Sequence, residues 1–136
     1  MRYMYLISAV EDGKPPPQKL MEAVMKAGEQ AVAEGRMIGQ GGLTPLRAGG
    51  GARIELRRGK LNLHDGPFTE SKEVIGGFAI FEFATREEAL QSAIDFMELH
   101  RLYGEGWEGV CEMRELYPED MGCAAVQEHA KAGELA

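Results

Sequence analysis

Cysteine and histidine are scarce in this chain of 136 residues, which has two of the former and three of the latter. Cys111 and Cys123 do not form a Cys-x-x-Cys pair, so we expect two reduced thiols, one of them in the core. A structural zinc site cannot be built from these two residues, and the sequence predicts neither a metal nor a cofactor.

Basic residues are also in deficit, because 15 Lys and Arg face 22 Asp and Glu and leave a net charge of -7. No run of basic residues offsets this charge, which repels phosphate backbones, so direct binding of nucleic acid is not expected. Long apolar runs are missing too. The N-terminal run Met1–Ile7 is too short for a signal peptide, and nothing downstream approaches the length of a membrane span. These absences predict a soluble, cytoplasmic protein with no membrane contact.

What the sequence does contain is enough apolar residues for one core. Hydrophobic residues make up 44% of the chain, and this length and composition suit one domain better than two. We place that domain at residues 1–117. The remainder, 118–136, is rich in Ala and Glu, and we interpret it as a tail that is either a short helix or disordered.

Apolar and β-branched residues mark the strands, and turn residues separate them. Arg57-Arg58-Gly59 reads as the turn of a hairpin that delivers His64 and Asp65 to the end of its second strand. The predicted main strands are Arg2–Ala9, Arg36–Leu43, Phe78–Phe83 and Trp107–Leu116, and the hairpin joins Arg53–Leu56 to Lys60–Leu63.

Two segments carry the apolar periodicity of helices. The first spans Gln18–Glu34 and is followed by Gly35 as a C-terminal cap. The second begins after Thr85, which forms a capping box with Glu88, and ends at Gly104. The residues that we expect on its buried face are Ala89, Leu90, Ala93, Ile94 and Met97.

Without the hairpin, the order of elements is strand, helix, strand, strand, helix, strand. This is the ferredoxin-like order, in which two helices cover one face of an antiparallel sheet. The predicted fold class is therefore α+β, ferredoxin-like, with an inserted β-hairpin. Because the strands Tyr3–Ala9 and Phe78–Phe83 are apolar on both faces, we expect the uncovered sheet face to form a homodimer with a second copy.

A dense stretch, His64–Phe78, combines turn formers, acids and a base between the hairpin and the next strand. Gly66 precedes a proline and Asp65 suits an Asx-turn, so the stretch is interpreted as a structured corner. It resembles the signature Asp-Gly-Pro-Phe-x-Glu-x-Lys-Glu-x-x-Gly-Gly-[Phe/Tyr] of the DGPF branch of the YCII-related family, and every fixed position is filled. Gly39–Pro45 also resembles the family's Gly-rich Leu-x-Pro segment, with Gly41 in place of a common acid.

The resemblance implies a fold of the dimeric α+β barrel type, but it implies no single reaction, because the family as a whole has none established. The broader family is associated with a His-Asp pair whose histidine lies in the first half of the chain. Since Gln18–Glu34 contains no histidine, we do not carry that mechanism over. Family members are also linked to extracytoplasmic-function sigma factors, and an acidic chain would meet such a partner through protein contacts.

Asp65 is the candidate catalytic residue, and three roles are open to it. It caps backbone amides in the turn, or it serves as a general acid or base in a pocket that removes it from water. A third role, in orienting a ligand or a metal, has only the neighbouring His64 in its support. Alternation turns His64 to the opposite face of the strand, which disfavours a catalytic dyad between the two.

Further candidates are expected to bind a ligand: Tyr5, Phe68, Lys72, Glu112 and Arg114. Lys72 either belongs to a solvated charge cluster with Glu70 and Glu73 or orients the signature loop. Glu112-Met113-Arg114 resembles the closing Glu-x-Arg of the family, and alternation directs both charges away from the helices. Arg114 would there hold a carboxylate or phosphate, or form a salt bridge instead.

Two functions are compatible with these residues. The first is the binding of a small molecule in a pocket between the open sheet face and the second copy, with weak acid-base chemistry of the lyase or isomerase type at Asp65. The alternative is a non-catalytic regulatory module that acts with an extracytoplasmic-function sigma factor.

Overall fold

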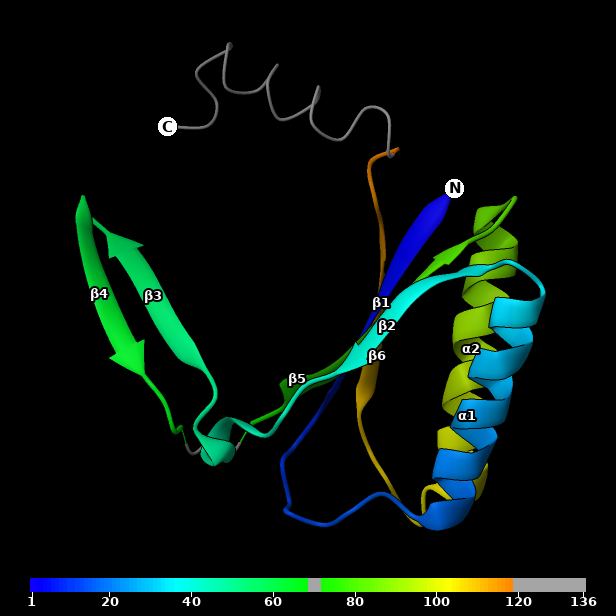
Figure 1. Ribbon diagram of the computed structural model, residues 1–136, viewed down its shortest axis with the longest axis horizontal. Helices are drawn as coiled ribbons and strands as arrows, with labels where there is room; N and C mark the ends of the chain where they lie inside the picture. The colour runs from blue at the N-terminus through cyan, green and yellow to red at the C-terminus, as the bar shows by residue number, and fades with distance from the viewer. Residues whose placement is uncertain (69–71, 119–136) are drawn as a thin grey trace.

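The computed structural model describes residues 1–68 and 72–118, and Figure 1 shows how their helices and strands are arranged. The proposed tail, with Cys123 and His129, lies almost wholly outside the described residues. In chain order the elements are β1 (Arg2–Ala9), α1 (Gln18–Ala33), β2 (Met37–Gly42), η1 (Leu46–Ala48), β3 (Ala52–Arg57), β4 (Lys60–Asp65), β5 (Val74–Glu82), α2 (Arg86–Tyr103) and β6 (Val110–Glu115).

The main sheet has the strand order β2-β5-β1-β6, and all its neighbouring strands are antiparallel. Figure 1 shows α1 and α2 side by side on one face of this sheet. The α+β, ferredoxin-like fold predicted from the order of elements is therefore confirmed. β1 is a central strand, which agrees with its apolar, aromatic and β-branched composition.

The register of β1 decides which side chains meet the helices. Tyr3 and Tyr5, paired with Phe81 and Ala79 of β5, belong to a core that also contains Ala89 of α2. Side chains alternate along a strand, so the intervening positions of β1 and β5 face away from the helices. This open face carries Met4, Leu6, Phe78 and Ile80, all of them half-buried.

β5 is longer than predicted, because it begins at Val74 and not at Phe78. Gly76 and Gly77 depress the strand propensity of this segment, and the sequence pattern therefore missed its first part. Pairing with β1 on one side and with β2 on the other compensates for the low strand propensity of the two glycines. The register with β1 shifts at Gly76, and the N–H of Leu43 donates to the carbonyl oxygen of Gly76 at 3.0 Å.

The second helix begins as predicted, since the Thr85 hydroxyl oxygen accepts a hydrogen bond from the N–H of Glu88 at 3.2 Å. The prediction assigned too many residues to the buried face of this helix. Leu90 and Ile94 are 39% and 49% exposed, whereas Ala89 and Ala93 are buried. Apolar residues occupy two neighbouring stripes of this helix, and the stripe of small alanines is the one turned toward the core.

The predicted hairpin is confirmed, with β3 and β4 forming a separate two-stranded sheet. Arg58 and Gly59 form its turn with φ angles of 52° and 76°, as in the two-residue turns that match the twist of paired strands. Figure 1 shows the hairpin standing away from the main sheet, on the side opposite the helices.

The corner at the foot of the hairpin is structured, as predicted, but the hydrogen bonds that hold it join distant backbone segments and are not those of the Asx-turn expected at Asp65. The N–H of Gly66 donates to the Gly51 oxygen at 2.8 Å, and the N–H of Phe68 donates to the Leu46 oxygen at 3.0 Å. A Cβ atom at Gly66 would lie 2.6 Å from the Gly51 oxygen, so this close approach of two backbones requires glycine. Asp65, the last residue of β4, is exposed beside it.

Candidate functional site

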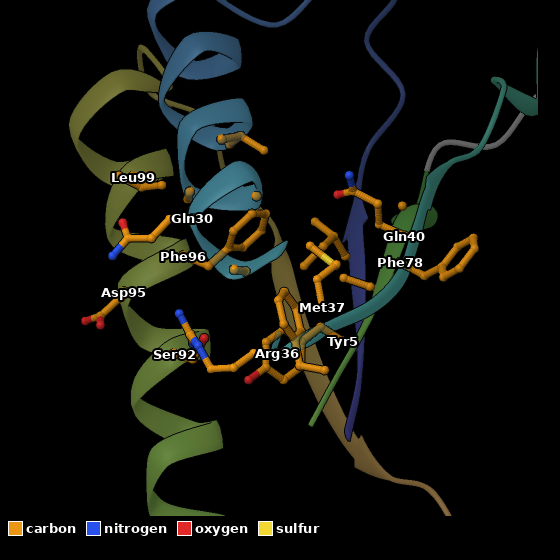
Figure 2. A pocket seen from close by; sticks show the side chains of 18 of the residues that line it. Tyr5, Gln30, Arg36, Met37, Gln40, Phe78, Ser92, Asp95, Phe96 and Leu99 are labelled. Carbon is orange, nitrogen blue, oxygen red and sulfur yellow. The ribbon is translucent and has the colours of Figure 1, made fainter. Parts of the chain in front are cut away.

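A cavity of about 1030 Å³ lies between the helix layer and the sheet (Figure 2). Its volume is at the upper end of the range found for small-molecule sites. Small residues explain why the two layers do not fill the space between them. α1 contributes Ala27, Gly28 and Ala31, and the facing strand β5 contributes Gly77 and Ala79. A larger side chain at several of these positions would project into the cavity.

Aromatic rings line the sheet side of this cavity. The ring centroids of Tyr5 and Phe81 are 5.1 Å apart, and those of Phe81 and Phe83 are 5.9 Å apart. Figure 2 shows Phe96 projecting from α2 toward the sheet, so a ring also lies on the helix side. Aromatic surface on both sides suits a flat, apolar ligand.

Tyr5 joins the wall of the cavity to the helix above it. Its side chain is 3% exposed, and its hydroxyl donates to the carbonyl oxygen of Ala89 at 2.5 Å. Burial raises the pKa of Tyr5 above its ordinary value, so the phenol stays protonated at neutral pH. The residue therefore positions α2 against β1 and contributes an apolar ring to the cavity.

Arg36 is the cation in the described lining. It precedes β2, and Figure 2 shows its side chain reaching toward Ser92 of α2. Its guanidinium lies 5.5 Å from the ring centroid of Phe83, and its Nε donates to Glu34 Oε2 at 2.7 Å. Hydrogen bonds from Gln30 and from Arg36 lower the pKa of Glu34, which keeps that carboxylate charged. Arg36 is thus held in place by contacts on two sides.

The remaining polar lining comes from amides, a hydroxyl and two carboxylates: Gln30, Gln40, Gln91, Ser92, Glu88 and Asp95. Asp95 and Glu88 are exposed, and Asp95 accepts a hydrogen bond from the Gln91 side chain at 2.8 Å. Among the residues that line the described cavity there is no histidine and no buried carboxylate. The polar groups of the lining are hydrogen-bond donors and acceptors that can orient a bound molecule.

Only one residue selected from the sequence, Tyr5, lines this cavity. Asp65 and Lys72 are exposed elsewhere on the chain. Phe68 lies at the foot of the hairpin, where the guanidinium of Arg53 is 4.4 Å from its ring centroid. The sequence-selected residues are therefore not gathered into one site within a single chain.

Glu112 and Arg114 lie on the open face of β6, as alternation predicted, because they pair with Leu6 and Met4 of β1. Arg114 Nη1 donates to Glu112 Oε2 at 3.3 Å, which is the salt bridge expected as the alternative to ligand binding. Both side chains are exposed.

His100 is buried outside the large cavity, between two aromatic rings. Its ring centroid is 4.8 Å from that of Phe96 and 4.6 Å from that of Trp107. The Nδ1 atom lies 3.0 Å from the carbonyl oxygen of Phe96. It borders a second, smaller cavity of about 240 Å³ and serves as a packed core residue. Cys111 is a free thiol on the helix side of the sheet, and burial raises its pKa.

Sequence reasoning missed Arg36, Gln40, Phe81 and Phe96, although all four line the cavity. The available signal was the concentration of Gly and Ala on elements that face one another. In the described part of the chain, no three His, Cys, Asp or Glu side chains are placed to hold a metal ion. The helices of that part are too short or too polar to cross a membrane.

In a comparison with known families, the model of the YCII-related domain matches residues 1–103. A search of curated proteins finds no match. Every residue that lines the large cavity lies within the matched region. β6, with Glu112 and Arg114, lies beyond it.

Proposed function

Because the chain belongs to the YCII-related family and its cavity lies wholly within the matched region, we propose that it binds a small, flat, largely apolar molecule between helices and sheet. The observation that carries this proposal is the cavity of about 1030 Å³. The cavity is partly open to solvent, since Gln30, Gln40 and Gln91 of its lining are exposed, and its apolar walls lack dispersion contacts across the space between the layers. A bound molecule would restore those contacts.

The lining indicates how such a molecule would be held. The rings of Tyr5, Phe81 and Phe83 offer a continuous apolar wall to one side of the ligand. Arg36 and Gln40 are donors at the sheet side of the cavity, so a ligand with a carbonyl or carboxylate group at one end satisfies them. The polar groups of α2 would orient the rest of the molecule.

Binding without catalysis is the function that this geometry supports best. Asp65 is exposed and stands outside the lining, so acid-base chemistry there would require a second chain to remove its carboxylate from water. That chemistry and a sigma-factor partner stay predictions from the sequence.

A panel of bicyclic aromatic compounds tests the proposal, with 2-naphthoate and 2-naphthamide as first probes. Thermal stabilisation of the wild type is the expected result for at least one of them, followed by a saturable isotherm in calorimetry. Gly28→Leu should remove that stabilisation, because its new side chain points toward Gln40, whose side chain lies 3.9 Å from a Cβ placed at Gly28.

The matched control is Glu29→Leu, which adds the same side chain at the next, exposed position of α1. It should leave probe binding unchanged. Equal binding by Gly28→Leu and wild type would place the probe elsewhere and contradict the proposal. Failure of every probe to bind, up to millimolar concentration, would do the same.

A further inference from the structure

The β3–β4 hairpin exposes one apolar face. Ile54 pairs with Leu63 and Leu56 pairs with Leu61, so the four side chains share one side of the two-stranded sheet. Each of them is between 64% and 72% exposed. Asp65 lies on the same side at the foot of the hairpin, and the alternate positions carry Arg53, Glu55, Arg57, Lys60, Asn62 and His64.

This face is unusual for a surface that stays in water. Singly scattered exposed leucines are ordinary, but four contiguous aliphatic side chains on a projecting hairpin mark an interaction site. A two-stranded sheet alone is also of marginal stability and needs a surface to pack against. Both facts indicate that the hairpin is covered in the working protein.

The foot of the hairpin is held firmly, which makes it an arm with a defined direction. The Gly66–Gly51 and Phe68–Leu46 backbone hydrogen bonds close the foot, and Arg53 stacks on the Phe68 ring. Figure 1 shows the arm on the same side of the main sheet as the open face. The arm and that face are thus the two apolar surfaces left on this side of the chain.

The distribution of charge between the hairpin and the rest of the chain indicates what kind of partner covers the hairpin. The hairpin, residues 52–65, has four basic and two acidic side chains and therefore a charge of +2, which leaves -9 on the rest of the net -7 chain. A basic arm on an acidic body is electrostatically complementary to the body of another copy of itself. A nucleic acid would meet the arm's cations but would be repelled by the body.

We propose that the β3–β4 hairpin is an arm that packs its apolar face against a second copy of this chain. In a two-fold dimer each copy contributes one arm and receives the other, so the contact is made twice. The arm adds a second contact to the sheet-to-sheet dimer expected from the sequence, and it does not depend on the small-molecule proposal.

The test compares the two sides of the arm in the full chain. Leu61→Ser with Leu63→Ser removes half of the apolar face, while Asn62→Ser with His64→Ser alters the opposite side of the same strand. We expect the leucine variant to weaken the dimer by roughly tenfold or more in sedimentation equilibrium, and the control to match the wild type. Far-UV circular dichroism and thermal melting of both variants confirm that the main sheet is intact.

A second variant guards against misfolding of the arm itself. Residues 52–65 are replaced by Gly-Gly, which is feasible because the Gly51 oxygen and Gly66 nitrogen are only 2.8 Å apart. This chain should fold and dimerise at least as weakly as the leucine variant. A wild-type monomer at about 100 μM overturns the proposal. So does a dimer of unchanged affinity in both arm variants, or arm-dependent binding of an RNA probe.

Discussion

The two faces of the main sheet start from similar apolar composition and end in different environments. On the helix side, β1 buries Tyr3 and Tyr5 beneath α2, and a large cavity remains beside them. On the open side, Met4 and Leu6 are half-buried, and neither α1 nor α2 covers them. A single strand therefore contributes one set of alternating residues to the proposed ligand site and the other set to the proposed protein contact.

The difference between the faces lies in what each can bind. On the helix side, the cavity is lined by aromatic, amide and hydroxyl groups, which are the groups found in small-molecule sites. The open face is an apolar surface bordered on its edge strand β6 by the Glu112–Arg114 pair, an arrangement typical of a protein interface with a polar rim.

The largest effect on stability is expected from a substitution on the covered face, which is the side of the main sheet that packs against α1 and α2. Tyr5→Ala removes a ring that is 3% exposed together with its hydrogen bond to Ala89, and should lower the free energy of unfolding by about 3–5 kcal/mol. Met4→Ala, one residue earlier on the open face, should cost about 1 kcal/mol. Urea denaturation at one fixed protein concentration measures both. Equal costs would mean that the two faces are not distinct.

A charged substitution on the open face should weaken the proposed dimer without unfolding the chain. Ile80→Lys puts a charge at the centre of the proposed sheet contact and should weaken the dimer by about 2–3 kcal/mol. Light scattering across a dilution series detects the change, and Glu29→Lys at an exposed position of α1, on the other side of the sheet, is the control. If Ile80→Lys splits the dimer while both arm variants keep it, the sheet contact stands and the arm proposal falls.

A more conservative substitution, Tyr5→Phe, tests the contribution of the Tyr5 hydroxyl, which links β1 to α2. Tyr5→Phe removes the buried hydrogen bond from the phenol to the Ala89 carbonyl and should cost about 1 kcal/mol at neutral pH. Because the pKa of Tyr5 is raised in the folded state, the unfolded chain releases this proton first, and the wild type loses stability as pH rises through and beyond 10.0. The Tyr5→Phe chain should lack that component. Parallel alkaline slopes of the two proteins would contradict the pKa shift.

The smallest effect is expected at the exposed ion pair on the open face. Arg114→Ala should change the free energy of unfolding by less than about 0.5 kcal/mol, since both partners are largely hydrated. Arg36→Ala on the covered face should be similarly mild for stability but should weaken 2-naphthoate more than 2-naphthamide. A loss of 2-naphthoate binding in Arg114→Ala would move the ligand to the open face.

Much of the fold was readable because its signals are local. The capping of α2 by Thr85 and the turn at Arg58 and Gly59 each depend on a few neighbouring residues. Errors arose where distant pairing decided the outcome. Gly76 and Gly77 became part of β5, because β1 and β2 pair with that strand on both sides.

The candidate site was harder to predict for a related reason. A cavity is a space between layers of structure, and the types of the residues that line it do not indicate it in the sequence. Arg36 and Gln40 look like ordinary residues of a strand and its approach until the spacing of α1 from the sheet is known. The Asp-Gly-Pro turn made Asp65 the candidate catalytic residue, yet Asp65 is the last residue of β4, a strand that projects away from the helices.

The sequence by itself determined the family, the order of elements, the alternation of side chains along each strand and the position of the hairpin, because these follow from patterns a few residues long. Only the tertiary structure decided that Tyr5 and not Leu6 meets the helices, that the layers leave a cavity, and that the hairpin's apolar face is uncovered. Those outcomes depend on register and on the spacing of layers, which arise from contacts between residues far apart in the chain.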